Sequence, residues 1–494
     1  MSTRLTPLDA TFLELEEADP SAHMHIGAIM VFEALPGGGV PTVGALRCHL
    51  DTRLGVLPRY SQRLSETHTG GFAWPQWQRD PRFDIARHVT RAALPAPGGE
   101  RELHDWSSVF FSTRLDRRRP LWEMVLVEGL AAGRWALASK THHCMVDGVG
   151  SVDVGHLLLD TVAAPTPPRR RQHRPATANE SAAERPAPVD GGGLAALGRA
   201  WAGSGTLATL THAAHASVHG ALHPRRTLGD ARAALEVIAR DELHGAAHTS
   251  LNEPIGTLRR FEVVRVELEQ LKRIKATLGG TINDVVLAIV AGGVAELLRS
   301  RGEPLPAQGV RAMVPMNVRD AGEHLALGNR VSSLFVELPL AGDAAARYRE
   351  TVARSSALKS GGRQAAGTSA VIELAGLAPP IVHVALAQAL YATRLFNITV
   401  TNVPGPQQTL YAFGAPLREI HPLVPLAASH ALGVAVVSYD GEVFFGVVAD
   451  RDSVADIEVL TGAMDATAAE LDALAGRASA PPARVRGAPA AAHA

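Results

Sequence analysis

Two adjacent histidines, His142 and His143, close an apolar run that begins at Trp135. Asp147 stands four residues after His143, and Gly148 follows it directly. A neutral imidazole can accept a proton near neutral pH and return it later in the same reaction. Asp147 is near enough in the chain to orient such a ring, and Gly148 allows a sharp backbone turn. The group is therefore a candidate for general acid–base catalysis.

The apolar run predicts a β-strand that leads to the histidines and then to a turn. The apolar segment 121–130 before it predicts an antiparallel partner strand, and a helical pattern at 152–162 follows the turn. Successive side chains of a strand point to opposite faces, so His142 and His143 cannot both face one cavity.

Residue types and spacing alone leave other interpretations of this group open. A histidine at a strand end is often structural, and Asp-Gly is an ordinary turn pair, so spacing does not decide between structure and catalysis. A metal site is a weaker alternative, because no further ligand at suitable spacing accompanies His143 and Asp147. Cys144 would need a lowered pKa and a partner base to act as a nucleophile, which a sequence cannot show.

Composition narrows the class of protein. The 494 residues give room for two or three domains, and a formal net charge of −1 does not indicate a nucleic-acid partner. Two cysteines, Cys48 and Cys144, make no disulfide framework, and the N-terminal residues lack the apolar core of a signal peptide. We therefore expect a cytoplasmic protein.

The segment from His142 to Gly148, HHCMVDG, resembles the HHxxxDG motif of the acyl-CoA-dependent acyltransferase superfamily, which includes chloramphenicol acetyltransferase and peptide-synthetase condensation domains. From about Leu5 to Leu474 the chain is similar to the bacterial wax ester synthase/diacylglycerol acyltransferase family. Segments that match in the family's order are Leu5–Phe12, Pro120-Leu121-Trp122, Asn283-Asp284 and Asn397–Pro406. Trp122 and the nearby His88 are interpreted as packing residues.

The resemblance implies an α/β (α+β) fold of two chloramphenicol acetyltransferase-like halves, each a mixed sheet with flanking helices, and an active-site tunnel between them. We expect an N-terminal half at 1–163 with the HHxxxDG motif and a C-terminal half at 194–478. Residues 164–193, rich in Pro and Arg, and the tail 479–494 cannot bury enough apolar surface to order themselves, so they are predicted as linker and disordered tail.

The function that the resemblance implies is O-acyl transfer from acyl-CoA to diacylglycerol, to a long-chain alcohol, or to both. His143 would be the general base, His142 would orient its neighbours, Asp147 would support the site and Gly148 would make the turn. The sequence has no GxSxG nucleophile elbow, so we expect direct transfer without an acyl-enzyme. Acyl-CoA is a co-substrate, and no cofactor or metal is expected.

Three further residues are assigned through the resemblance. Asn283 and Asp284 precede a long apolar helix, where an Asn or Thr can cap the helix. In the family this pair lies near the active site, so we expect Asn283 to cap the helix and, with Asp284, to bind substrate. Arg319 is the hypothetical partner that holds Asp147 in place.

Lipid substrates imply contact with lipid. We expect peripheral association with the inner face of the membrane or with lipid droplets, through the apolar stretches 194–222 and 364–393. The second stretch is interrupted by Glu373 and two prolines, so two buried or interfacial helices are expected and not a membrane span.

Two alternatives remain: an acyltransferase for a polyketide or peptide-synthetase product, and a non-catalytic lipid-binding or lipid-droplet protein.

Overall fold

The structure is a computed structural model that describes residues 5, 7–65, 75–146, 155, 157–164, 245–317, 331–361 and 395–479. Asp147, Gly148 and Arg319 lie outside the described residues. The same holds for most of the predicted linker, the tail, and the two apolar stretches expected to contact lipid. The expectations for these segments stay predictions.

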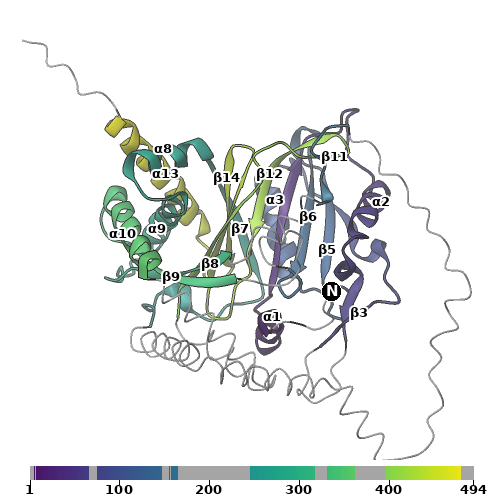
Figure 1. The fold of residues 1–494 in the computed structure, drawn as a ribbon, viewed down its shortest axis with the longest axis horizontal. Coiled ribbons are helices and arrows are strands. Elements are labelled where there is room, and N and C mark those ends of the chain that lie inside the picture. Colours follow the sequence, from purple (N-terminus) through teal and green to yellow (C-terminus); the bar gives the residue numbers. More distant parts are fainter. Residues whose placement is uncertain are drawn as a thin grey trace, which may run out of the picture.

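Two six-stranded sheets form the centre of the molecule (Figure 1). The N-terminal sheet has the order β11 (Tyr411–Ala412), β12 (Ala415–Leu423), β1 (His25–Phe32), β6 (Trp135–His142), β5 (Trp122–Glu128), β4 (Val89–Ala93). The C-terminal sheet has the order β7 (Arg259–Glu267), β14 (Glu442–Asp450), β13 (Leu432–Tyr439), β10 (Ile398–Pro404), β8 (Val310–Asn317), β9 (Val331–Leu338). Each sheet contains parallel and antiparallel pairs, which confirms the expected mixed sheets.

Helices cover the sheets. The described α-helices are α1 (Pro7–Ala18), α2 (Val43–Leu54), α3 (Glu100–Ser112), α8 (Leu268–Leu278), α9 (Ile282–Ser300), α10 (Ala344–Gly361) and α13 (Ile457–Ser479). Helices α8, α9, α10 and α13 lie together on the outer side of the C-terminal sheet, and α1 lies near one end of the junction between the sheets (Figure 1). Helix α9 is buried along almost its whole length, which explains why its sequence is apolar on every face.

Within the described part of the chain, no single helix has the length and apolar composition to cross a membrane. Helices α8 and α9 meet that test only as a pair, which is bent by 102° at its break.

The motif strand β6 has the predicted geometry. It pairs antiparallel with β5, as expected, and with β1 on its other side. Trp135 and Leu137 belong to the core between the N-terminal sheet and α2, whereas Ala136 and Ala138 belong to the core that continues into the C-terminal half. The alternation expected from a strand is therefore confirmed.

The packing interpretation of Trp122 and His88 is also confirmed. The Trp122 side chain is 1% exposed, and its Nε1 donates to the Tyr60 carbonyl oxygen at 2.8 Å. His88 stacks on Trp122 with ring centroids 4.6 Å apart.

Strand β12 departs from the expected sequence boundary. It lies within 194–478, yet it pairs with β1 and completes the N-terminal sheet. Strand β12 contains Pro416, Glu419 and Pro422, residues that are unfavourable in a strand interior, so its pairing depends on contacts far away in the sequence. A Cβ atom added at Gly446 of β14 would lie 1.8 Å from the Pro422 carbonyl oxygen, so the two sheets meet at close backbone contact.

Two other expectations were wrong in their bounds. The residue pattern of 41–64 predicts one amphipathic helix, but α2 ends at Leu54 and is followed by a 3-10 turn, Pro58–Ser61, and the short strand β2, Gln62–Leu64. Gly55 and Pro58 both disfavour continuation of the helix. The residue pattern of 75–89 predicts a strand with its exit, but the chain forms β3, Trp77–Arg79, and then the 3-10 turn Ile85–Arg87.

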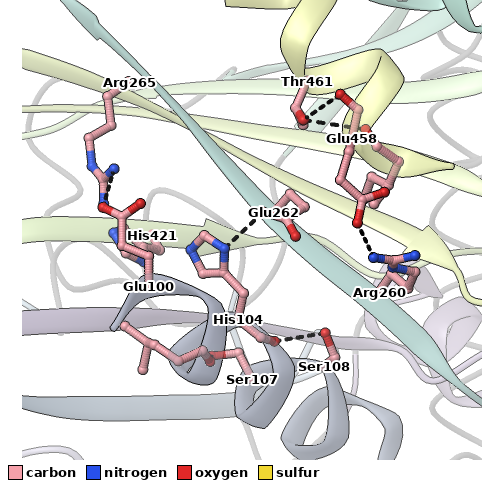
Figure 2. Close-up of polar contacts among 12 residues, drawn as sticks. Glu100, His104, Ser107, Ser108, Arg260, Glu262, Arg265, His421, Glu458 and Thr461 are labelled. Atoms are coloured by element: carbon pink, nitrogen blue, oxygen red, sulfur yellow. Dashed lines mark hydrogen bonds and ion pairs between the residues drawn. The ribbon is translucent and has the colours of Figure 1, made fainter. Parts of the chain in front are cut away.

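Polar side chains on α3 and β12 contact strand β7 of the C-terminal sheet. On α3, His104 Nδ1 lies 2.9 Å from Glu262 Oε2 of β7, and Figure 2 shows the histidine ring turned toward that strand. On β12, Glu419 contacts Arg265 of β7 at 2.6 Å and Arg134 at 3.2 Å. These pairs are partly buried and hold α3 and β12 against the C-terminal sheet.

The apolar runs 432–438 and 443–448 on either side of Asp440-Gly441 predict a β-hairpin, which the structure confirms. This hairpin allows a stability test. Strands β13 and β14 pair in register, and Asp440 and Gly441 have φ values of 45° and 87°. We expect Gly441→Ala to lower the free energy of unfolding by about 1–2 kcal/mol, because an L-residue is strained in the left-handed region.

The matched control for this test is Gly462→Ala in α13. A Cβ there meets no atom within 4 Å, and the backbone is helical. Urea denaturation should therefore show a gain of about 0.5–1 kcal/mol for the control. Equal effects of the two substitutions would contradict the turn assignment.

Candidate active site

His143 lies directly after β6 and is half-buried, whereas His142 has a fully buried side chain. The backbone N–H of His143 donates to the Met24 carbonyl oxygen at 2.8 Å. Its ring stacks on Phe12 of α1, with centroids 4.0 Å apart and planes inclined by 13°. Phe12 thus covers one face of the imidazole, and the segment before β1 holds the backbone of His143.

The hydrogen bonds of His142 determine its tautomer. The backbone N–H of Cys144 donates to His142 Nδ1 at 3.1 Å, so Nδ1 must carry a lone pair. His142 Nε2 lies 3.1 Å from Glu16 Oε2 and therefore carries the proton that this carboxylate accepts. Both nitrogens are occupied, so His142 positions the backbone next to His143 and is not available as a base.

Glu16 of α1 organises the buried side of the site. Its side chain is 1% exposed and reaches His142, His25 at 3.5 Å and Arg114 at 3.3 Å. Burial alone would raise the pKa of the Glu16 carboxyl, but hydrogen bonds and charge interactions with His142 and His25 outweigh it. The pKa is held well below its usual range, and Glu16 is a buried carboxylate.

Cys144 does not have the environment of a nucleophile. Its side chain is fully buried, and burial raises the pKa of the thiol well above its usual value. A thiol that stays protonated is a poor nucleophile. Over the described residues, no group of three or more His, Cys, Asp or Glu side chains is arranged to hold a metal ion.

The N-terminus of α9 corrects part of the interpretation of Asn283. The helix is capped by Thr281, whose side chain accepts from the backbone N–H of Asp284. Asp284 Oδ2 in turn accepts from the Thr281 N–H at 2.8 Å, which completes a capping box. The expectation that Asn283 caps the helix was therefore wrong.

These contacts give Asn283 and Asp284 different surroundings. Asp284 is 1% exposed, and its hydrogen bonds with Thr281 form the helix cap. Asn283 is half-buried, and its Oδ1 lies 3.4 Å from Asn402 Nδ2 at the end of β10. Asn283 stays the candidate for substrate positioning.

The site residues thus fall into two groups. His142 and His143 stand together in the N-terminal half with Glu16 and Phe12, whereas Asn283 and its neighbour stand in the C-terminal half. Asp147, Gly148 and Arg319 belong to segments that the structure does not describe, and their expected roles stay predictions.

Comparison with known proteins decides the family. Residues 5–286 match the family model of the wax ester synthase/diacylglycerol acyltransferase catalytic domain, and residues 327–472 match that of the WS/DGAT C-terminal domain. The chain belongs to the wax ester synthase/diacylglycerol acyltransferase family. It is an acyltransferase, as the motif around His143 indicated.

Relatives of this acyltransferase match along nearly their whole length. A probable diacylglycerol O-acyltransferase of Mycobacterium tuberculosis (strain ATCC 25618 / H37Rv) is 32% identical over 475 residues, which cover 96% of each chain. A second such protein of that strain is 30% identical over 477 residues, covering 96% of this chain and 99% of the relative.

Solved structures confirm the two-lobed fold of this WS/DGAT family member. The wax ester synthase/diacylglycerol acyltransferase from Marinobacter aquaeolei VT8 superposes with a TM-score of 0.65 and 25% identity, covering 96% of this chain and all of that one. The first condensation domain of the CDA synthetase gives a TM-score of 0.60 at 15% identity, with 97% of each chain covered. The second likeness concerns the fold alone.

Sequence reasoning missed two residues of the acyltransferase site, Phe12 and Glu16. They stand four positions apart on α1, so they share one face of the helix. The only sign of these two residues in the sequence is a carboxylate and an aromatic ring on the same helix face. This spacing does not identify a site, because His142 and His143, which they contact, lie far along the chain.

The buried histidines predict a pH dependence of stability. Burial lowers the pKa of His25 to about 3 and that of His23 to about 4. The unfolded chain therefore takes up protons below a pH of about 6.5 while the folded chain does not, so stability is lost as the pH falls. We expect the free energy of unfolding to drop by up to about 2 kcal/mol for each histidine between pH 7 and pH 5.

Urea denaturation at several pH values measures this drop. Glu16 acts in the same direction at lower pH, because a carboxyl with a lowered folded-state pKa loses stability as the pH falls. The variant His25→Asn should show a shallower pH dependence than the wild type. An unchanged slope would show that His25 is not held neutral in the folded protein.

Proposed function

We propose that this acyltransferase moves a long-chain acyl group from acyl-CoA to the hydroxyl of diacylglycerol, with a long-chain alcohol as an alternative acceptor. The products are a triacylglycerol or a wax ester, and free CoA. The observation that carries the proposal is His143, a half-buried imidazole within the HHxxxDG motif, held by Met24 and stacked on Phe12. The descriptions of the relatives supply the substrate classes.

In the proposed mechanism His143 is the general base. Its imidazole takes the proton from the acceptor hydroxyl while the oxygen attacks the thioester carbonyl. When the tetrahedral intermediate collapses, the C–S bond breaks and the same proton passes to the leaving CoA sulfur. The acyl group goes directly to the acceptor, and the reaction as written uses no cofactor.

The surroundings of His143 suit this role. A base must be held in one orientation, because misplacement by a fraction of an ångström slows proton transfer and attack. Phe12 limits the tilt of the ring, and His142, fixed by Glu16, holds the backbone at Cys144. In the C-terminal half, Asn283 is proposed to position substrate.

The proposed acceptors are insoluble in water, so the proposal includes work at the surface of a membrane or a lipid droplet. Sedimentation with phosphatidylcholine vesicles that contain diacylglycerol tests this part. Binding that rises with diacylglycerol content supports it, and protein that stays in the supernatant at every content contradicts it.

Product analysis tests the proposed function. Purified protein is incubated with palmitoyl-CoA and either diacylglycerol or hexadecanol, and the lipids are identified by mass spectrometry. Triacylglycerol, wax ester or both should form only when the matching acceptor is present. Free palmitate as the only product would indicate a thioesterase, and the absence of any product would favour a different acceptor or a non-catalytic lipid-binding role.

A further inference from the structure

The loop between α1 and β1 holds the backbone of the proposed base. Met24 lies in this loop, and its carbonyl oxygen accepts from the His143 N–H at 2.8 Å. The loop is held together internally: Ser21 N and Ser21 Oγ donate to Asp19 Oδ1 at 2.8 and 2.6 Å. The Ala22 N–H also donates to the Asp19 carbonyl oxygen at 3.0 Å. These contacts fix the conformation of the loop around Ser21, three residues before Met24.

Arg259 reaches this loop from the C-terminal half. It is the first residue of β7, its side chain is 3% exposed, and its Nη2 donates to the Ser21 carbonyl oxygen. Its Nη1 donates to the carbonyl oxygens of Gly256 at 2.7 Å and Leu258 at 3.1 Å. The guanidinium is thus fixed in its own half while it binds the loop of the other half.

The Arg259 guanidinium is held mainly by backbone carbonyl oxygens and less by an ion pair. Its ion-pair partner is Asp450, whose Oδ1 lies 3.8 Å from Nη1, too far for a hydrogen bond. That same Oδ1 accepts from the Gly256 N–H at 2.7 Å, so it holds the backbone that Arg259 also binds. A buried guanidinium is costly to desolvate unless it satisfies several acceptors, and three of those of Arg259 are backbone carbonyls.

The neighbouring Arg260 has a different role. Its guanidinium binds Glu458 and the Ala455 carbonyl oxygen, both within the C-terminal half. Figure 2 shows this arginine beside Glu458, at the start of α13. Of these two consecutive arginines, Arg259 contacts the loop that holds His143 across the junction of the halves, whereas Arg260 makes its contacts within the C-terminal half.

We propose that Arg259 is a positioning residue for acyl transfer, which aligns His143 by fixing the loop from Asp19 to Met24 across the junction of the two halves. The proposal rests on the proposed role of His143 as the base. It makes the rate of the chemical step depend on a contact between the halves, far in sequence from the HHxxxDG motif. Loss of this contact should let the loop and the His143 backbone move without removing any group that binds substrate.

The test compares Arg259→Gln with its matched control Arg260→Gln. Palmitoyl-CoA and the acceptor that gives product with the wild type are the substrates, and rates are expressed per folded protein. We expect Arg259→Gln to lower kcat by about 10- to 100-fold with KM for both substrates unchanged, because misplacement affects the reaction more than binding. Arg260→Gln should keep the wild-type kcat. Arg259→Lys, which retains the cation but not the planar group, should fall between them.

Hydrogen exchange gives a second readout that does not depend on activity. In Arg259→Gln the amides of 20–25 and of 142–146 should exchange faster, while those of β13 and β14 stay protected. A structural role alone would raise exchange in the C-terminal sheet as well and would leave kcat per folded protein unchanged. If Arg259→Gln does not fold, the comparison is made with Arg259→Lys.

The possible results separate the two proposals. Wild-type kcat in Arg259→Gln, or equal losses in the Arg259 and Arg260 variants, overturns the positioning role while the function stands. Acceptor-dependent transfer that survives His143→Ala overturns the role of the base, and the inference about Arg259 falls with it.

Discussion

Replacing His143 with alanine is expected to lower the kcat of acyl transfer by about 10²- to 10⁴-fold, the range that a general base contributes. Without the imidazole, the acceptor hydroxyl must attack while it still carries its proton. The substrates are still held together, so a small residual rate is expected from proximity alone. The measurement is the rate of product formation from palmitoyl-CoA and the preferred acceptor, at saturating concentrations of both.

Controls separate this loss from a loss of folding. His143 is half-buried directly after β6, and its removal deletes the stack with Phe12. Thermal unfolding of the variant should therefore remain close to that of the wild type. The matched control is His248→Ala, the same substitution at an exposed histidine that faces Glu253 at 3.6 Å. Equal activity in the two variants would exclude His143 as the base.

Glu16→Gln is expected to have the second largest effect. The carboxylate offers two acceptor oxygens: Oε2 faces the His142 N–H at 3.1 Å, and Oε1 faces the Arg114 guanidinium at 3.3 Å. An amide keeps only one acceptor, and its NH₂ group turns a donor toward a donor. Leaving one buried donor unsatisfied should lower the free energy of unfolding by about 1–3 kcal/mol.

The same substitution should lower kcat, because Glu16 fixes the ring of His142 and thereby the backbone next to His143. We expect a loss of about tenfold or more with little change in KM, since misplacement of a catalytic group affects the chemical step. Glu17→Gln is the matched control: this neighbour is 64% exposed and pairs with Arg117 at the surface. Its variant should keep the activity and the stability of the wild type. Unchanged kcat in Glu16→Gln would show that His142 does not need this carboxylate.

Local signals in the sequence predicted much of the fold. The strand that ends in the two histidines, its antiparallel partner and the hairpin at Asp440-Gly441 were all predicted, because apolar alternation and turn residues are local properties. The long apolar helix at Asn283-Asp284 was also predicted, and it is α9, Ile282–Ser300, since a long apolar run after a cap is a strong signal.

Long-range pairing could not be predicted in the same way. Strand β12 crosses into the N-terminal sheet, although Ala415–Leu423 contains two prolines and charged residues. The importance of Glu16 depends on partners from β1, β6 and the segment after α3, which only the fold brings together. The position of Arg259 at the junction has the same origin. The functional motif, in contrast, was recognisable because its seven residues are contiguous.

The most direct test of the account is the release of free CoA by purified protein in a single turnover of palmitoyl-CoA, with and without diacylglycerol or hexadecanol. Direct transfer with His143 as base predicts no release without an acceptor, complete release with one, and loss of that release in His143→Ala. A stoichiometric burst of CoA without an acceptor would reveal an acyl-enzyme. Such a burst, or full acceptor-dependent release by His143→Ala, would contradict the mechanism.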